Sequence, residues 1–494
     1  MSGRFTGARA VACNTALLAL LCACNSSDPS KLAPGGGPTP PPFTSVTQVR
    51  VSMALSLTPN CEGVAATGTL YPNTAATPAL AIHPLLPMNF AAAWQANVWS
   101  DDGAQVIALA ATFDGGHTWT PASAAFTRCS GGSSANAGNF ARAGQASVAY
   151  GSTGTVYALA AVFTGTAFAA GSDSGMLVAT SGDGGLTYGT PVSLIFDGNT
   201  FLNERGTVAA DPVSPNFAYA VWDRVNSTGD GATYLSVSSD GGATWTAGSP
   251  VYIPGIGSQT TGNQIVLLPA GVLLVVFTEF DTVAGAKTAT LRAISSANHG
   301  VNWSPPATIA GIQSVGTTDP ATGAPVRDGA GLASVSVGAN GIVYVAWQDS
   351  RFSAGARDGI ALSSSKDAGI TWTTPLQVNT ATTAQAFTPT VNVRSDGLIA
   401  VTYYDLRTNA TTPIAGSLFA DCWMVTSPDG TTFTEQHLSG AFDLLHAPKS
   451  PGQFLGDHQA LVSTSDAILP FYVQTNAGAA VSSDAFISFP PATP

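Results

Sequence analysis

The octet SSDGGATW, residues Ser238–Trp245, decides how this sequence is interpreted, because close copies of it recur along the chain. An acid or amide stands at its third position, glycine follows, and an aromatic ring ends it. The copies are TFDGGHTW (112–119), SGDGGLTY (181–188), SANHGVNW (296–303), SKDAGITW (365–372) and the shortened SPDGTTF (427–433). The third positions are Asp114, Asp183, Asp240, Asn298, Asp367 and Asp429, spaced 57 to 69 residues apart. Recurrence at this spacing indicates a repeat fold.

The residue types of the octet suit a structural task. A carboxylate or amide oxygen accepts backbone N–H bonds inside a tight turn. Glycine adopts backbone angles that other residues resist, and the aromatic ring covers apolar surface where the chain returns to a sheet. We therefore interpret the octets as scaffold and look for chemistry elsewhere.

A pair of apolar segments with a short turn lies before each octet, for example GLASVSVGANGIVYVAW (331–347). Each pair predicts two buried strands, and each octet then joins a third strand to a fourth. A seventh pair starts at His458, and its unit ends after a third strand, AFISF (485–489), without an octet. We expect VTQVRVSM (46–53) to supply the missing strand and close a ring, which removes exposed sheet edges.

The octets resemble the Asp-box of sialidases and related β-propellers. The whole segment from about residue 47 to residue 490 is similar to the sialidase-like BNR-repeat glycosyl hydrolase proteins of bacteria. That resemblance is carried by NERGTVAADPVSPNFAYAVWDR (203–224), VAWQDSRFSAGARDGIALS (345–363) and FLGDHQALVSTSDAILPFYVQTN (454–476). We predict an all-β Asp-box propeller over residues 46–494 with seven four-stranded blades. A six-bladed ring, as in the sialidases, is the alternative.

The resemblance implies an exo-α-sialidase-like glycoside hydrolase that acts on terminal acidic sugars of glycans. A non-catalytic propeller that binds glycan or protein at the cell surface is the alternative. A third hypothesis is a structural envelope lipoprotein whose charged residues only brace the ring. All three hypotheses use the same charged face, which lies opposite the octets because strands alternate in direction.

Acid–arginine pairs gather on that face, for example in WDR (222–224) and YYDLR (403–407). Sialidases bind the substrate carboxylate with three arginines, whose planar guanidinium forms two bonds to a carboxylate. They use a Tyr nucleophile, activated by a Glu, and an Asp as acid/base. By this resemblance the candidate substrate-binding residues are Arg224, Arg351, Arg407, Arg205, Asp223 and His458. The candidate catalytic residues are Tyr404, Glu204, Asp349, Asp405 and Asp457.

The sequence also departs from the family pattern. The tripeptide Arg-Ile-Pro of sialidases is absent, and WQANVW (94–99) has Asn97 and Val98 where relatives carry an Asp-Arg pair. Arg142, in RAGQAS (142–147), lacks the acid and tryptophan expected after it. The charged pairs are also compatible with surface ion pairs, which contribute little to stability. We expect no cofactor, although Asp223, Asp349 and Asp405 are of the ligand type that calcium prefers.

The N-terminal region predicts export. Arg4 and Arg9 precede the apolar run ALLALLCAC (16–24), which is too short to span a membrane and whose end resembles a lipobox. We predict a signal peptide over residues 1–24, lipidation of Cys24, a Pro/Gly-rich linker over residues 25–45, and attachment to the outer membrane. Secretion or a periplasmic location is the alternative.

Composition sets the remaining expectations. The formal net charge of −12 argues against nucleic acid as a partner, so we expect a glycan or glycoconjugate and contact with the membrane only through the lipid. We expect a monomer. Outside the cytoplasm Cys61 and Cys129 can form a disulfide, which would leave Cys422 unpaired.

Overall fold

The computed structural model describes residues 46–491, except residues 56, 64–66, 284, 411–414 and 479–480. The chain divides into a unit of residues Met1–Phe43 and a second unit, Thr44–Pro494. The predicted signal peptide, the candidate lipidation site Cys24 and the predicted linker lie outside the described residues. Among the helices that the structure describes, none has the length and apolar character needed to cross a membrane.

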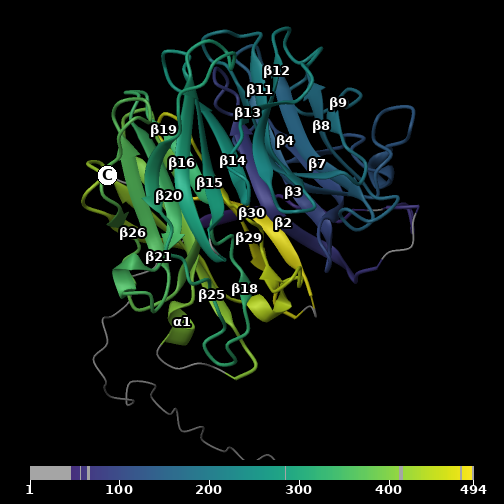
Figure 1. Ribbon diagram of the computed structural model, residues 1–494. Helices are drawn as coiled ribbons and strands as arrows, with labels where there is room; N and C mark the ends of the chain where they lie inside the picture. Colours follow the sequence, from purple (N-terminus) through teal and green to yellow (C-terminus); the bar gives the residue numbers. More distant parts are fainter. Residues whose placement is uncertain are drawn as a thin grey trace, which may run out of the picture. The chain divides into compact units, whose positions relative to one another are not determined.

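The second unit consists, over its described residues, of four-stranded antiparallel groups that follow one another along the chain (Figure 1). The first three groups are β2 (Leu70–Ile82), β3 (Phe90–Trp99), β4 (Ala104–Thr112) and β5 (Thr120–Ala122); β6 (Arg142–Tyr150), β7 (Val156–Thr164), β8 (Asp173–Ser181) and β9 (Val192–Phe196); β10 (Phe201–Ala210), β11 (Ala218–Asn226), β12 (Gly231–Ser238) and β13 (Ser249–Tyr252). The next three are β14 (Ser258–Leu267), β15 (Leu273–Val283), β16 (Ala286–Ser296) and β17 (Ala307–Gly311); β19 (Ala333–Val337), β20 (Val343–Asp349), β21 (Gly359–Ser365) and β22 (Leu376–Gln377); β23 (Ala386–Val393), β24 (Ile399–Asp405), β25 (Phe419–Ser427) and β26 (Thr434–Asp443). The last group contains β28 (Ala460–Ser463), β29 (Ile468–Thr475), β30 (Ser483–Phe489) and the N-terminal β1 (Thr47–Arg50).

A few short elements lie between these groups. Two residues each of β18 (Val326–Arg327) and β27 (Gln453–Phe454) pair in parallel. The described helices are the single-turn α1 (Arg407–Ala410) and the 3₁₀ turns η2 (Arg128–Ser130), η3 (Arg351–Ser353) and η4 (Leu444–His446).

The first strands of the groups contact one another in the order β2, β6, β10, β14, β19, β23, β28, and β28 contacts β2 again. Side chains on these inner strands bond to the next strand: Val208 N donates to Ser147 Oγ at 3.1 Å, and Val335 N donates to Gln264 Oε1 at 3.0 Å. Such bonds satisfy backbone groups that an inner strand would otherwise leave unpaired. The predicted all-β Asp-box propeller is confirmed.

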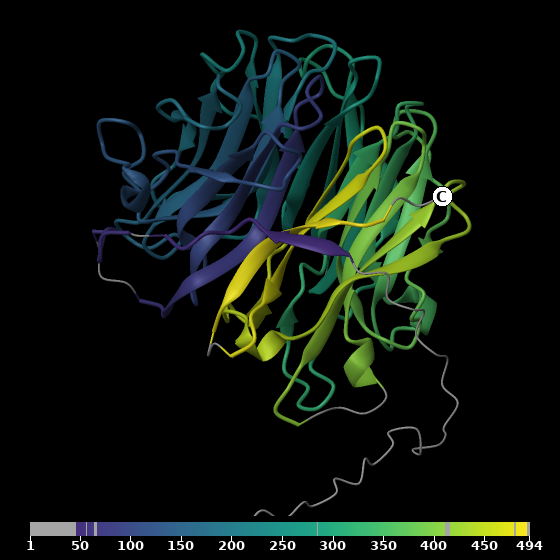
Figure 2. The same cartoon turned by 180° about the vertical axis from the view of Figure 1, so that it is seen from behind.

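The N-terminal strand closes the last group. β1 pairs antiparallel with β30, and Thr47 lies opposite Phe489 and Arg50 opposite Phe486 (Figure 2). The prediction that residues 46–53 supply the missing strand is therefore confirmed. Pairing the two ends of the fold in one sheet makes closure depend on both ends of the chain.

The apolar core lies between neighbouring groups. All nine residues of β4 are buried, because both faces of that strand are covered. Ile107 and Leu109 of β4 pack with Val162 and Leu177 of the second group. Each large buried side chain contributes about 1.5–3 kcal/mol on transfer from water, so these contacts between groups hold the ring together.

The octets form the turns between third and fourth strands, as predicted. Asp183 Oδ1 accepts from Thr187 N at 2.9 Å, and Asp183 Oδ2 accepts from Thr187 Oγ1 at 2.5 Å. These bonds, chiefly the one from the Thr187 hydroxyl, lower the pKa of Asp183 to about 2. Asn298 accepts the equivalent backbone bond from Asn302 N at 2.9 Å. The octets are scaffold, and we call their side of the propeller the octet face and the opposite side the mouth face.

Candidate functional site

A channel of about 360 Å³ runs between the inner strands. We call its end toward the mouth face, where Arg205 and His458 belong to the lining, the channel opening. Near this opening several inner strands carry a β-bulge, where the pairing register shifts. Bulges re-aim side chains. Residues of these bulges have a left-handed backbone, namely Thr77, Gln145, Arg205, Gly262 and Thr388. The fold thus directs side chains of several groups toward one opening.

Arg205 occupies the bulge of β10. Its Nη1 donates to Thr261 Oγ1 at 2.9 Å, and its buried Nε has no hydrogen-bond partner among the described residues. Burial alone would lower the pKa of Arg205, but neighbouring carboxylates, chiefly Glu204 and Asp457, raise it. The guanidinium is therefore charged, and its buried Nε is an unsatisfied donor.

Arg327 reaches the same opening from β18. Its Nη2 donates to Asp457 Oδ2 at 2.9 Å and its Nε donates to Asp457 Oδ1 at 3.1 Å. The guanidinium lies 4.0 Å from the ring centre of Phe454. Burial would raise the pKa of Asp457, but the charges of Arg327 and Arg205 hold it well below its usual value. This is a bidentate pair between segments 130 residues apart.

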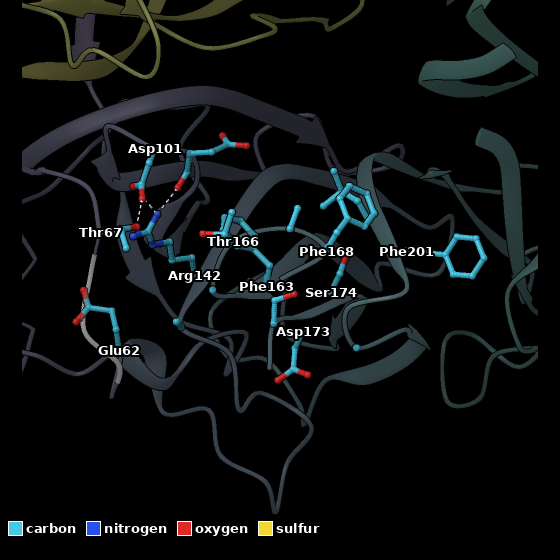
Figure 3. Close-up of a pocket in the computed structure, with 17 residues that line it drawn as sticks. Glu62, Thr67, Asp101, Arg142, Phe163, Thr166, Phe168, Asp173, Ser174 and Phe201 are labelled. Atoms are coloured by element: carbon cyan, nitrogen blue, oxygen red, sulfur yellow. Dashed lines mark hydrogen bonds and ion pairs between the residues drawn. The ribbon is translucent and has the colours of Figure 1, made fainter. Parts of the chain in front are cut away.

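A pocket of about 290 Å³ opens beside this pair, between loops of the first three groups (Figure 3). In Figure 3 the guanidinium of Arg142 points toward Asp101, and Arg142 Nη1 donates to Asp101 Oδ1 at 2.7 Å. Burial opposes ionisation of Asp101, yet hydrogen bonds from Thr67 and Arg142 lower its pKa. The aromatic side chains in the pocket lining are Phe163, Phe168 and Phe201. Charged and apolar walls together suit a sugar, which has hydroxyls and apolar ring faces.

Asp102 connects the pocket with the channel opening. Its backbone oxygen accepts from Arg142 Nη1 at 3.0 Å, and its Oδ1 lies 3.4 Å from Arg327 Nη1. The Asp102 side chain is 56% exposed, whereas that of Asp457 is 3% exposed. Asp102 is therefore the most exposed carboxylate among these charges, ahead of Asp101, whose side chain is 36% exposed.

The N-terminal segment supports one wall of the pocket. The predicted disulfide between Cys61 and Cys129 is confirmed, with 4.9 Å between the Cα atoms, and Cys422 is free and buried. The adjacent Glu62 lines the pocket, and its Oε1 accepts from Gln105 Nε2 at 2.5 Å. The disulfide thus ties a pocket residue to the body of the first group.

The predicted arginines Arg224, Arg351 and Arg407 do not meet. Arg224 pairs bidentately with Asp197 at 2.6 and 2.8 Å. Arg351 pairs with Asp349 at 2.8 and 2.9 Å. Arg407 donates to Asp405 at 2.7 Å and to Glu435 at 2.9 and 3.0 Å. Each brace belongs to its own part of the ring, so we correct the prediction that these three arginines form one carboxylate site.

The predicted Tyr404, Asp349 and Asp405 are also not at the opening. Tyr404 is in the core, where its hydroxyl donates to Val473 O at 2.7 Å, and burial raises its pKa well above the usual value. Asp349 and Asp405 are fully buried beside their arginines. Burial raises the pKa of Asp405 to about 7, against the opposing effect of Arg407. A buried tyrosine cannot attack a sugar, and the nucleophile assignment is corrected.

Other predicted residues do come together. Asp223 accepts from Gly262 N at 2.8 Å and from Asn263 Nδ2. Burial, and next the charge of Glu204, raises the pKa of Asp223 well above its usual value. His458 lines the channel, and burial lowers its pKa. Arg205 and His458 thus line the channel, and the charges of Glu204, Asp223 and Asp457 act on Arg205 from nearby.

The calcium hypothesis is not supported by this arrangement. Asp223, Asp349 and Asp405 stand on β11, β20 and β24 and bond to separate partners. Within the described part of the chain, the side chains spaced to hold a metal ion are Cys61, Glu62 and Cys129. Two of these form the disulfide, so their sulfur atoms are not free thiolates.

Sequence reasoning missed Asp101, Asp102 and Arg142, and did not select Arg327. The signal was present, because Asp101 and Asp102 follow the second strand of their group just after Trp99. The acid is displaced by a few positions from the WDR pattern, and only the turn geometry shows that it reaches the same face.

Residues 88–412 match the family described as BNR repeat-like domain. The chain belongs to this family. No curated protein matches the sequence.

Solved structures with a similar fold include the Hadza microbial sialidase Hz136, at 13% identity and a TM-score of 0.47, which covers 81% of this chain and 76% of that chain. A protein of unknown function from Dyadobacter fermentans matches at 13% identity and a TM-score of 0.45, over 90% of this chain and 99% of that chain. The α-L-arabinofuranosidase Arb93A of Fusarium graminearum matches at 11% identity and a TM-score of 0.41, over 90% of this chain and 97% of that chain. Similarity at this level carries no conclusion about activity.

Proposed function

We propose that this BNR-repeat protein is an exported, sialidase-like glycoside hydrolase whose site is the pocket together with the channel opening. The observation that carries the proposal is Asp102, whose exposed carboxylate lies 3.4 Å from Arg327 and whose backbone oxygen accepts from Arg142. General acid catalysis needs a carboxyl group within reach of the leaving oxygen, and Asp102 is accessible for that purpose.

Arg327 and Arg142 are proposed to bind the carboxylate of a terminal acidic sugar. The contact between Arg327 and Asp102 is long, at 3.4 Å, so a substrate carboxylate can replace it while Asp457 keeps the guanidinium in place. Asp102, released from Arg327, takes up a proton from solvent and then donates it to the leaving oxygen. Glu204, half-buried beside Arg205, is the second carboxylate, which activates water or attacks the sugar.

A non-catalytic glycan-binding propeller is the second candidate. It is favoured by the absence of tyrosine among the described residues that line the pocket and the channel. Sialidases attack with a tyrosine, so a carboxylate would have to replace it here. All three arginines of the opening and pocket also lie close to carboxylates, which reduces their attraction for an anion.

We further propose that the chain is attached to the outer membrane through lipid on Cys24 and acts as a monomer on glycans or glycoconjugates. The lipobox-like end of the apolar run supports the anchor. Secretion without lipid, or a periplasmic location, is the alternative.

The test is hydrolysis of a fluorogenic α-sialoside and a fluorogenic α-L-arabinofuranoside by the parent, Asp102→Asn and Asp466→Asn. Asp466 is exposed in the turn between β28 and β29 on the octet face, which makes it a matched control. Turnover of the α-sialoside that only Asp102→Asn loses supports the proposal. Turnover of the arabinofuranoside alone would reject the acidic substrate. Glycan binding without turnover of either would establish the second candidate.

A further inference from the structure

Five large apolar side chains are exposed on the octet face of the first two groups. They belong to the turn between β2 and β3 and to the first two octets: Leu85, Leu86, Met88, Phe113 and Leu186, with 37% to 72% of each residue exposed. We call these five residues the apolar patch. Exposed apolar residues that lie together often mark an interaction surface.

Backbone hydrogen bonds fix the turn that carries Leu85, Leu86 and Met88. Leu85 N and Leu86 N both donate to His83 Nδ1, at 3.0 and 3.2 Å, and Gly115 N donates to Met88 O at 2.9 Å. Met88 covers Gly115 of the first octet, and Phe113 covers Gly184 of the second. The turn is therefore built to present these side chains outward.

The chain enters the propeller next to this patch. Thr47, the first residue of β1, lies opposite Phe489, whose ring stacks on His117 of the first octet at 4.7 Å. The 22 residues between Cys24 and Thr47 can span at most about 75 Å even when fully extended. A lipid on Cys24 would thus keep the first group within about 75 Å of a bilayer, which allows the patch to reach the bilayer surface.

We propose that the apolar patch inserts into the surface of the bilayer to which the chain is anchored, so that the mouth face points away from the membrane. This proposal goes beyond the catalytic one and rests on the lipid anchor. The segment Ile82–Asn89 carries no acidic or basic side chain apart from His83. The two octets that contribute Phe113 and Leu186 carry Asp114 and Asp183, whose hydrogen bonds hold their pKa below the usual value, so the inserted part of the patch is Leu85, Leu86 and Met88. The protein has a net charge of −12. Apolar burial rather than attraction to anionic lipid would therefore hold the patch, and a zwitterionic surface is the partner.

The orientation also has a functional consequence. The pocket lies on the mouth face, opposite the patch. Contact through the patch would leave the site open to glycans outside the membrane, whereas contact through the mouth face would cover it.

An environment-sensitive fluorophore tests this on the full lipidated chain bound to phosphatidylcholine–phosphatidylethanolamine vesicles. It is attached to Leu86→Cys and, as a matched control, to Ile256→Cys. Ile256 is fully exposed in the loop between β13 and β14, on the mouth face. Cys422 is buried and does not compete for the label.

We expect a blue shift with a several-fold gain in emission at position 86 and no change at position 256. No change at 86, an equal change at both positions, or failure of the chain to bind vesicles would overturn the proposal. A change at position 86 that appears without vesicles when the protein concentration is raised would also overturn the proposal, because it would indicate that a second copy of the chain covers the patch. The readout involves no turnover, so it fails separately from the hydrolase proposal.

Discussion

Two sets of arginines behave differently in this propeller. Arg224, Arg351 and Arg407 follow the repeat, at the ends of second strands, and each is held by a nearby carboxylate. Arg142, Arg205 and Arg327 depart from the repeat, and they meet around Asp102 and the channel opening. The repeated set braces the ring, and the irregular set forms the candidate site.

The difference has a physical origin in sequence distance. Arg351 and Arg407 pair with carboxylates two residues away, so one local turn fixes each pair. Arg327 pairs with Asp457, 130 residues away, and with Asp102, 225 residues away. A pair that joins such distant segments can form only when the ring has closed.

The largest expected effect is on catalysis. Asp102→Asn should lower kcat on the active glycoside by about 10²- to 10⁴-fold, because it removes the proton donor. The free energy of unfolding should stay within about 0.5 kcal/mol, since the side chain is mostly exposed. Steady-state kinetics and urea denaturation measure both. Unchanged kcat would exclude Asp102 from the mechanism.

The repeated set should show the opposite behaviour. Arg351→Ala should lower the free energy of unfolding by about 3–5 kcal/mol, because it leaves the buried Asp349 without its charge partner. Turnover per folded molecule should be retained. Arg394→Ala is the control, since its partner Asp396 is 52% exposed, and it should cost less than about 1 kcal/mol. Equal costs for the two variants would contradict the bracing role.

The buried Asp405 should make the free energy of unfolding depend on pH. Its pKa in the folded protein is about 7, above the value of about 3.9 in an unfolded chain. Between these values the folded state binds the proton more tightly, so this group makes the protein less stable as pH rises from 4 to 7. Asp405→Asn should flatten that decline in urea denaturation series. Parallel curves for both proteins would show that Asp405 does not titrate in this range.

The smallest effect concerns the scaffold. Asp183→Ala should cost about 1 kcal/mol of stability, since it removes the acceptor of the Thr187 bonds. Asp183→Asn should cost less, because Asn298 makes the equivalent backbone bond in its own octet. Thermal unfolding of both variants gives the comparison. A larger loss for the amide than for alanine would show that the octets depend on charge.

The fold could be predicted because the same strand and turn pattern recurs along the chain, so that a weak signal in one copy is supported by the others. Six octets and seven apolar pairs indicated four-stranded units, and the N-terminal strand followed from the one unit that lacked a strand. The disulfide was predictable from the number and positions of the cysteines that follow the signal peptide. Each of these depends on local pattern or on counting.

The site was harder to predict because it depends on which loops meet. The sequence selected Arg205, Glu204 and Asp457, whose charges interact in the structure. It gave the same weight to Arg351, which pairs with the buried Asp349. Sequence neighbours such as Tyr403 and Tyr404 alternate between the two faces of a strand, and burial of both faces hides that difference. The orientation of Tyr404 toward Val473 is a tertiary fact.

The most direct measurement compares conservative variants from the two sets, Arg327→Lys and Arg351→Lys. Both keep the positive charge but lose the planar fork. The measured quantity is kcat/KM on the active glycoside, or the Kd of the bound glycan if the chain only binds. We predict a loss of at least about tenfold for Arg327→Lys and less than about twofold for Arg351→Lys. The reverse order would contradict the assignment of the site to the irregular set of arginines.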